Sequence, residues 1–256
     1  MTKPVSIKEL TAQFHAITAL DDPLLEAYMT DSRQGVQKLL ATTRKRLTKL
    51  AEQKRAFAER FFYERQAHQQ GRMLVAGIDE VGRGPLAGPV VSCAIILPDH
   101  FDVIGVNDSK QLSDHKREQL YPQILKQAVS VGIGIATNDQ IDQLNIYQAT
   151  RVAMLEAVKQ LTPQPDQLLI DAMQIDTDIP QLKLIKGDAK SVSIGAASIV
   201  AKVFRDHLMQ SYDTLYPGYE FGHNAGYGTQ AHLAGLKRLG PSPIHRKTFE
   251  PVSNYF

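Results

Sequence analysis

The sequence has 256 residues, enough for one large domain or for one domain with a small appendage. Its hydrophobic share of 43% and charged share of 22% exclude a disordered chain, and the single cysteine, Cys93, excludes an internal disulfide. The net charge of +2 gives no sign of a polyanionic partner, so the distribution of charge along the chain is more informative than its sum.

Residues 1–70 carry the signals of helices. Ser6 and Glu9 form a capping box before apolar residues spaced three and four apart, which predicts a first helix. Asp22 before Pro23 predicts the start of a second helix, because aspartate is a good N-cap and proline suits the first helical position. No proline occurs from residue 32 to residue 70, and we expect one long helix there. Its apolar seam would contain Val36, Leu40, Leu47, Leu50, Phe57 and Phe61.

The long predicted helix carries most of the positive charge. Residues 33–72 sum to +8, whereas residues 1–32 and residues 73–256 each sum to −3. One interpretation is that the basic helix contacts the phosphates of a nucleic-acid duplex, which would make binding strongly salt-dependent. The other is a solvated helix that packs on the rest of the chain through its apolar seam. The sequence leaves both interpretations open.

From Met73 onward the pattern changes to β-branched runs separated by glycine and proline. Residues 73–80 and 89–98 predict two strands joined by a glycine-rich turn. Strands first as a meander, then alternating with helices, predict an α/β fold with a mixed sheet flanked by helices. The further predicted strands are 130–137, 167–171 and 182–187, and the predicted helices are 112–128, 145–160, 192–212 and one near 229–239.

Four acidic residues lie at or just after the ends of predicted strands: Asp79, Glu80, Asp171 and Asp188. Each one alone is more typical of a turn or an N-cap, but together they could form an oxygen cage of the kind that Mg²⁺ or Mn²⁺ prefers. Neighbouring residues of a regular strand face opposite sides of the sheet. We therefore expect the strand to end, bulge or bend at Asp79 and Glu80, if both serve one site.

The glycine-rich run at 82–89 lacks the Lys-Ser/Thr ending of a P-loop and does not open a helix, so a nucleotide cradle is not supported. It is either a plain hairpin turn or a place where the backbone approaches a ribose or phosphate closely, with Arg83 contacting phosphate. Other candidate phosphate contacts are Lys110, Lys190, Lys202 and His245-Arg246-Lys247, although each alone is more typical of a solvated surface charge.

Five ordered motifs resemble ribonuclease HII, the type 2 ribonuclease H, and the resemblance covers residues 72–256. Gly82-Arg83-Gly84 is more similar to ribonuclease HII than to ribonuclease HIII. The motifs are GIDEVGRGPLAGPVV at 77–91, NDSKQLS at 107–113, LLIDAM at 168–173, IKGDAKSVSIGAASIVAKVFRD at 185–206 and NAGYGTQAH at 224–232.

The resemblance implies a ribonuclease H-like fold, with a five-stranded mixed sheet flanked by helices in a catalytic domain at 72–256. Residues 1–71 would form a helical, basic extension. It also implies a metal-dependent endonuclease that hydrolyses the RNA strand of RNA–DNA hybrids and incises 5′ of single ribonucleotides in duplex DNA. The products would be 3′-hydroxyl and 5′-phosphate ends, and the enzyme would act in ribonucleotide removal during DNA replication and repair.

The resemblance further assigns roles to individual residues. The four carboxylates would be catalytic and would bind two Mg²⁺ or Mn²⁺ ions. Gly82-Arg83-Gly84 would sense the 2′-hydroxyl, and Tyr227 would lie at the RNA-to-DNA junction. We expect a location in the cytoplasm without a membrane partner, because no signal peptide and no apolar run of about 18 residues occurs. We also expect a monomer.

Two alternatives compete with this interpretation. One is another nuclease of the same superfamily, such as a resolvase or a transposase-like enzyme, which would use the same carboxylates without reading 2′-hydroxyls. The other is a nucleic-acid binding module with incidental carboxylates, for which the basic helix at 33–72 would be the binding surface.

Overall fold

The computed structural model describes residues 5–256, and its contacts divide the chain into two compact units. Unit 1 extends to Glu59, and unit 2 comprises Arg60–Phe256. The sequence predicts a division after residue 71 instead. The difference concerns only the segment 60–71, which belongs to unit 2.

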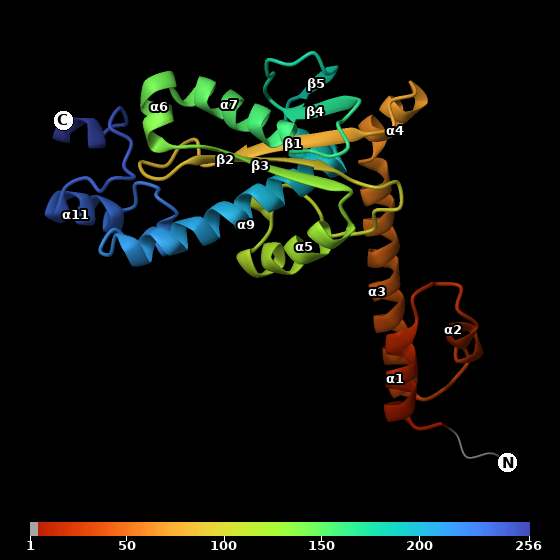
Figure 1. The fold of residues 1–256 in the computed structure, drawn as a ribbon. Helices are drawn as coiled ribbons and strands as arrows, with labels where there is room; N and C mark the ends of the chain where they lie inside the picture. Colours follow the sequence, from red (N-terminus) through yellow and green to blue (C-terminus); the bar gives the residue numbers. More distant parts are fainter. Residues whose placement is uncertain (1–4) are drawn as a thin grey trace. The chain divides into compact units, whose positions relative to one another are not determined.

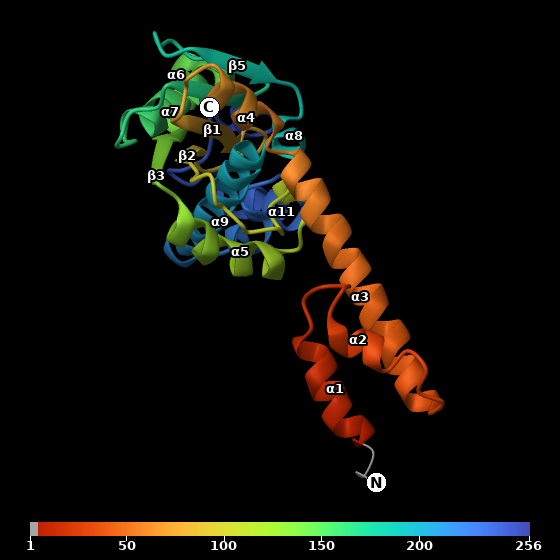
Figure 2. The same cartoon turned by 90° about the vertical axis from the view of Figure 1, so that its right-hand side faces the viewer.

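Unit 1 contains three helices: α1 (Ile7–Ala16), α2 (Pro23–Ala27) and α3 (Gln34–Glu59). The predicted caps are present, since Ser6 and Glu9 form the capping box of α1 and the Asp22 carboxylate accepts a hydrogen bond from the Leu24 N–H in α2. Helix α1 lies beside α3 (Figure 2). The two helices share a small apolar core to which Leu10, Phe14, Val36, Leu40 and Leu47 belong.

The prediction of one long helix from residue 32 to residue 70 is wrong. Helix α3 ends at Glu59, and a separate helix, α4, runs from Phe62 to Gln69. The buried residues of α4, Glu64 and Ala67, contact the β-sheet and helix α9 (Val192–Leu215) within unit 2. The Glu64 carboxylate accepts hydrogen bonds from the Ser191 hydroxyl (2.6 Å) and from the Ser193 N–H (3.0 Å). Tertiary contacts therefore interrupt a sequence that local propensity would continue as one helix.

Unit 2 is built on a five-stranded sheet, which confirms the predicted fold class. The strand order is β3-β2-β1-β4-β5. Strand β2 is antiparallel to β1 and β3, whereas β4 is parallel to both β1 and β5, so the sheet is mixed. The strands are β1 (Val75–Val81), β2 (Val90–Ile96), β3 (Ser130–Ala136), β4 (Gln167–Asp171) and β5 (Gln181–Leu184).

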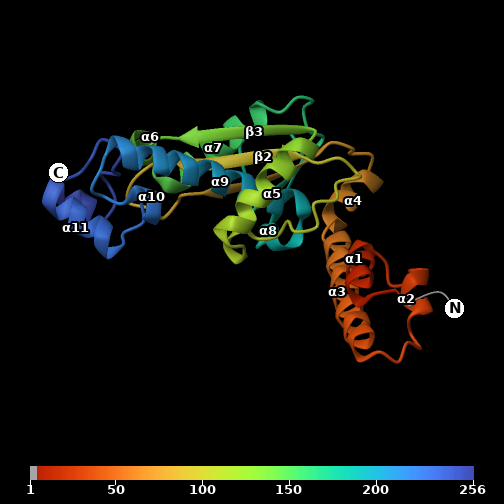
Figure 3. The same ribbon diagram turned by 90° about the horizontal axis from the view of Figure 1, so that it is seen from below.

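Helices cover both faces of this sheet (Figure 1). Helix α7 (Ile146–Lys159) packs on one face, against β2 and β3. Helix α9 (Val192–Leu215) crosses the other face against β1 and β2, with α5 (Asp114–Gln127) beside it (Figure 3). The approach of α9 is very close, because a Cβ atom at Gly77 of β1 would lie 2.1 Å from the Ser193 carbonyl carbon. The α9 face of β1 is also the face of Asp79, two residues further along.

The remaining elements of unit 2 connect these layers. The short helix α6 precedes α7 and is not predicted from the sequence. Among residues 5–256, no helix is long and apolar enough to cross a membrane. These elements are η1 (Ser109–Gln111), α6 (Asn138–Leu144), α8 (Gly187–Lys190), α10 (Phe221–Asn224), α11 (Gln230–Leu239) and η2 (Val252–Tyr255).

We predict that Glu64→Ala lowers the free energy of unfolding of the protein by about 2–4 kcal/mol, because it leaves buried donors of Ser191 and Ser193 unpaired. Urea unfolding followed by circular dichroism measures this change. Glu52→Ala, at an exposed position of α3, is the matched control and should change the stability by less than about 0.5 kcal/mol. Equal stabilities of the two variants would contradict the anchoring role of Glu64.

Candidate active site

The acidic residues gather where the parallel strands β1 and β4 end. Asp79 lies on β1 with only 4% of its surface exposed, Asp171 is the last residue of β4, and Asp188 lies in α8. The β1–β2 register is regular through Val81, without a bulge at Asp79 or Glu80. Strand β1 ends at Val81, and the backbone changes direction sharply at Gly82, whose φ is +90°. The distortion expected at Asp79 and Glu80 is therefore absent, and the backbone turns only after the acidic pair.

The carboxylates repel one another electrostatically. Burial raises the pKa of Asp79 well above its usual range, and the charges of Glu80 and Asp171 raise it further. Burial likewise raises the pKa of Glu80, opposed by Arg83 and reinforced by Asp171. The pKa of Asp188 is raised by burial and then by Asp108 and Asp171. The four predicted ligands therefore share one negative field, in which Asp171 acts on all three of the others.

Backbone N–H groups hold several of these carboxylates in place. The Oδ1 atom of Asp79 accepts a hydrogen bond from the Glu80 N–H (2.8 Å), and Oδ1 of Asp171 accepts one from the Gly187 N–H (2.7 Å). Oδ1 of Asp188 accepts one from the Ala189 N–H (2.9 Å). By contrast, Oε2 of Glu80 is buried and has no hydrogen-bond partner. Such an orphaned acceptor is costly unless a ligand completes it.

The donor set fits a hard divalent cation, although the structure does not assemble a finished cage. In the described part of the chain, no group of three or more His, Cys, Asp or Glu side chains is arranged closely enough to hold a metal ion. The predicted ligands nevertheless offer only oxygen atoms, which Mg²⁺ and Mn²⁺ prefer. A cation would also remove the mutual repulsion and complete the orphaned oxygen of Glu80.

Most of the other predicted site residues line one cleft with a volume of about 180 Å³. Lys190 is exposed on α8 and is not part of this lining. Glu80 lines the same cleft as the glycine turn. Of the predicted residues, the cleft brings together Glu80, Gly82, Arg83, Gly84, Lys110, Lys202 and Tyr227, and its wall also contains Val81, Ser109 and Ser198.

The basic residues of the cleft are held by acidic partners. Burial alone would lower the pKa of Lys110, but the surrounding carboxylates, Asp79 and Asp188 foremost, outweigh burial and raise it. The ammonium group of Lys202 lies 2.6 Å from Asp206, and Arg83 lies 3.6 Å from Glu80. These contacts hold the side chains of Lys202 and Arg83 in place where both residues line the cleft.

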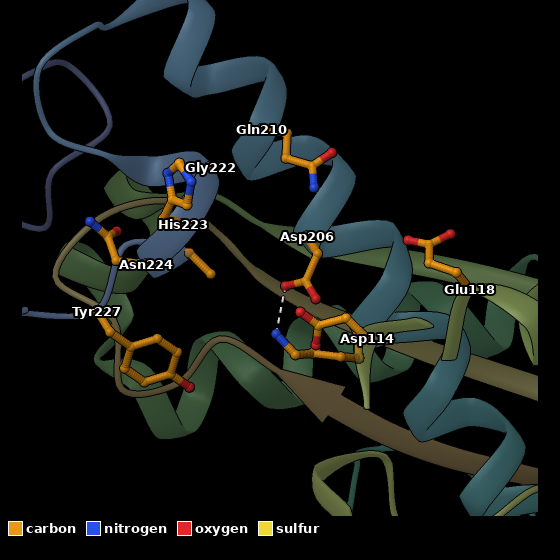
Figure 4. A pocket seen from close by; sticks show the side chains of 10 residues that line it. Asp114, Glu118, Asp206, Gln210, Gly222, His223, Asn224 and Tyr227 are labelled. Carbon is orange, nitrogen blue, oxygen red and sulfur yellow. Dashed lines mark hydrogen bonds and ion pairs between the residues drawn. The ribbon is translucent and has the colours of Figure 1, made fainter. Parts of the chain in front are cut away.

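A second pocket of about 290 Å³ adjoins the cleft and shares Lys202 and Tyr227 with it. Figure 4 shows the Tyr227 ring on one side of this pocket and the Asp206 carboxylate, paired with Lys202, on the other. Asp114 and Glu118 add two further carboxylates to the wall. The cleft is therefore flanked by an acidic pocket beyond Tyr227.

The loop that carries Tyr227 is anchored by a buried histidine pair. The Ser242 N–H donates to Nδ1 of His245 (2.9 Å), so the proton of His245 lies on Nε2 and is donated to Nε2 of His232 (3.0 Å). His232 then carries its proton on Nδ1 and donates it to the Tyr227 carbonyl (2.9 Å). The histidines thus fix the backbone of Tyr227, while its side chain stays 46% exposed.

Two of the residues suggested as phosphate contacts are not available for that role. His245 and Arg246 are 1% and 0% exposed, so this part of the prediction is wrong. Sequence reasoning also missed the carboxylate of Asp108, which acts on Asp188, and the hydroxyl of Ser198, which bonds to Asp79. Asp108 stands inside the NDSKQLS motif and could have been found there, whereas Ser198 lies in a small-residue helix without a distinguishing signal.

A mixed sheet with covered faces, carboxylates at the ends of its parallel strands, and matches to family models, relatives and solved structures place this chain among the ribonuclease H hydrolases. A family model described as ribonuclease HII matches residues 76–252, and one described as the ribonuclease HII N-terminal domain matches residues 6–68. The chain belongs to the ribonuclease HII family.

Relatives and solved structures agree with this assignment. The chain is 56% identical to a ribonuclease HII of Limosilactobacillus fermentum over 98% of both chains, and 61% identical to one of Lactobacillus acidophilus over 88% of this chain and 90% of that protein. Ribonuclease H2 of Pyrococcus horikoshii OT3 has a TM-score of 0.61 at 26% identity, covering 72% of this chain and 97% of its own. Bst-RNase HIII in complex with Mn²⁺ shares the fold, with a TM-score of 0.55 at 21% identity over 74% of this chain and 71% of its own.

Acidification should destabilise the protein through the buried histidine pair. Burial, together with the charge of His232, lowers the pKa of His245 to about 4, from an ordinary value of 6.5. The stability that neutral His245 contributes is therefore complete above pH 6.5 and is lost as the pH falls toward 4. Between pH 7 and pH 5 this loss should be about 2 kcal/mol.

Urea unfolding of the wild type and of His245→Asn at the two pH values tests this expectation. Asparagine does not titrate, so the variant should lose less stability than the wild type between pH 7 and pH 5. His15→Asn, at an exposed position of α1, should keep the wild-type difference. The explanation would be wrong if His245→Asn showed the full wild-type loss.

Proposed function

We propose that this protein is a metal-dependent endoribonuclease that hydrolyses the RNA strand of RNA–DNA hybrids and incises 5′ of single ribonucleotides in duplex DNA. The observation that carries the proposal is the shared cleft, in which the Glu80 carboxylate lies with the turn Gly82–Gly84 and with Tyr227. One of the four carboxylates, that of Glu80, thus lines the same cleft as groups suited to reading a sugar. Ribonucleotide removal during DNA replication and repair is the corresponding role in the cell, with the cytoplasm as the location and a monomer as the active form.

Asp79, Glu80, Asp171 and Asp188 would hold the cations, Mg²⁺ or Mn²⁺, and two ions suit the number of negative ligands. Divalent ions bound there activate water and neutralise the charge that develops on the attacked phosphate. The raised pKa values and the orphaned Glu80 oxygen support this donor set. A related fold, Bst-RNase HIII, is described in complex with Mn²⁺.

The other residues of the cleft bind and orient the substrate strand. The backbone of Gly82-Arg83-Gly84 reads a 2′-hydroxyl without regard to the base, because every ribonucleotide presents the same hydroxyl group. Tyr227, with its exposed ring, stacks on the nucleotide at the RNA-to-DNA junction. Lys110 and Lys202 contact phosphates from the cleft, and Lys190 contacts them from α8.

We predict that Asp79→Asn abolishes cleavage, lowering the rate with Mg²⁺ by about a thousandfold or more, because the variant loses one of the few charged ligands. The fold should stay intact, since the substitution removes a repelling charge from a buried cluster. Circular dichroism and the thermal midpoint check the fold, and Asp176→Asn, at an exposed loop position, is the matched control. Wild-type turnover in Asp79→Asn would exclude Asp79 as a metal ligand.

A second prediction concerns the products. A DNA duplex with one embedded ribonucleotide should be cut on its 5′ side, leaving a 3′-hydroxyl and a 5′-phosphate, when Mg²⁺ or Mn²⁺ is present and not after chelation. Analysis of end-labelled products on sequencing gels measures this. A 2′,3′-cyclic phosphate would indicate attack by the 2′-hydroxyl. Equal cleavage of an all-DNA duplex would indicate a resolvase-like enzyme, and binding without any cleavage would indicate a binding module.

A further inference from the structure

Two arginines are completely buried beneath the glycine turn of the cleft. Arg205 lies on α9 and Arg246 in the C-terminal segment, and both are 0% exposed. Each of the hydrogen bonds that their guanidinium groups donate ends on a backbone carbonyl oxygen. Within residues 5–256, neither guanidinium forms an ion pair with a carboxylate. Buried charges satisfied only by carbonyl oxygens are uncommon and call for an explanation.

Arg246 holds the inner side of the turn. Its guanidinium donates to the carbonyl oxygen of Gly88 (3.0 and 2.9 Å), to that of Arg83 (2.8 Å) and to that of Gly82. The ring of Phe249 lies 4.9 Å below it and closes the other side of the charge. The planar guanidinium offers several donors in a fixed fork, so one side chain can bind three separate carbonyls.

These contacts determine where the peptide N–H groups of the turn point. In a trans peptide the carbonyl and the N–H of the following residue point in opposite directions. The inward carbonyls of Gly82 and Arg83 therefore turn the N–H groups of Arg83 and Gly84 outward. Both residues are exposed and line the cleft, and neither N–H has an acceptor among the described residues. The cleft thus presents two free backbone donors.

Arg205 connects the same turn to the loop of Tyr227. Its guanidinium donates to the carbonyls of Pro89 (2.9 Å) and Ala87 (3.2 Å) on the turn, and to the carbonyl of Ala225 (2.8 Å) two residues before Tyr227. The Leu86 N–H adds a direct bond to the Gly226 carbonyl (2.8 Å). The turn 82–89 and the loop 224–229 are consequently connected by the buried Arg205 side chain and by one backbone hydrogen bond.

The identity of residue 82 follows from the same arrangement. A Cβ atom at Gly82 would lie only 2.2 Å from Nε of Arg205, in addition to the strain of φ +90°. At Gly84 the nearest atom to an added Cβ would be Cε1 of Tyr227, at an ordinary contact distance of 3.5 Å. Gly82 is thus required by the buried arginine, whereas Gly84 borders open space beside the tyrosine.

We propose that Arg205 and Arg246 are positioning residues that hold the turn 82–89 and the loop 224–229 as one rigid recognition element, with two outward N–H donors beside the Tyr227 ring. The element binds acceptor oxygens of the substrate strand, so the proposal rests on the proposed function. Lysine cannot replace either arginine, since a single ammonium group cannot reproduce the guanidinium fork with which Arg205 reaches carbonyls on both segments and Arg246 reaches three carbonyls of the turn.

A double-mutant cycle tests whether Arg205 acts through the tyrosine loop. On the one-ribonucleotide duplex, Arg205→Lys should lower kcat/KM about 30-fold in the wild-type background and about threefold or less in the Tyr227→Ala background. Residues that act as one element give such a non-additive result. Equal fold-losses in the two backgrounds would overturn the proposal, because a general loss of folded protein does not depend on Tyr227.

Hydrogen exchange measured by mass spectrometry gives a readout that does not depend on activity. Arg205→Lys should speed exchange about tenfold or more in both segments 82–89 and 224–229, with β3 unchanged. Unchanged exchange in either segment, or equal acceleration in β3, would overturn the proposal. Arg151→Lys, whose guanidinium bonds the Gln174 carbonyl on the far side of the sheet, is the matched control and should alter neither segment.

Arg246→Lys repeats both measurements, should Arg205→Lys fail to fold. This second variant should accelerate exchange in 82–89 and should also show a reduced effect on kcat/KM when Tyr227 is replaced by alanine. If the wild-type protein fails to cut the ribonucleotide duplex, the proposed function is wrong. The exchange of the two segments then still decides whether the arginines hold them together.

Discussion

Mutual repulsion among buried carboxylates is the constraint around which this fold is organised. The end of β1 and the end of β4 bring Asp79, Glu80 and Asp171 into one field, and α8 adds Asp188. Such a cluster costs free energy, which the apolar packing of the same strands must offset. Burial of β1 against α9, close enough that Gly77 cannot carry a Cβ atom, supplies part of that compensation. The fold therefore holds a set of oxygen donors in a state that a cation would stabilise.

The glycine turn of the cleft is held by two buried positive charges. Burial lowers the pKa of Arg205 to about 10 and that of Arg246 to about 9, yet both remain protonated at neutral pH. Carbonyl oxygens drawn toward these guanidiniums leave N–H groups facing the cleft. The cleft therefore combines the outward N–H donors of the turn with the Glu80 carboxylate. The near-neutral net charge of +2 conceals this local separation of charge.

Local sequence patterns were sufficient for much of the fold. The β4 boundaries, residues 167–171, and the caps of α1 and α2 agree with the prediction, because strand ends and N-caps leave signals within a few residues. The break between α3 and α4 had no such signal, since it depends on a hydrogen bond from Ser191 to Glu64, which is 127 residues away. The strand-end positions of the four carboxylates suggest a possible oxygen cage, and their roles follow only from the resemblance. The unpartnered oxygen of Glu80 and the mutual repulsion of the carboxylates depend on how the strands pack, which no local pattern of the sequence predicts.

The contacts that hold the glycine turn also could not be predicted from the sequence, because they join residues that are far apart in the chain. Arg246 is 164 residues from Gly82 along the chain, and in the sequence it stands in a short basic run that is typical of a solvated surface. The C-terminal segment also bonds the turn through its backbone, from the Gly88 N–H to the Ile244 carbonyl and from the Arg246 N–H to the Leu86 carbonyl. The geometry of the turn therefore depends on the last part of the chain being in place. A loss of the residues after Ser242 would remove the inward pull on its carbonyls, together with the packing of Phe249 on the apolar clusters that contain Val90 of β2 and Leu86 of the turn.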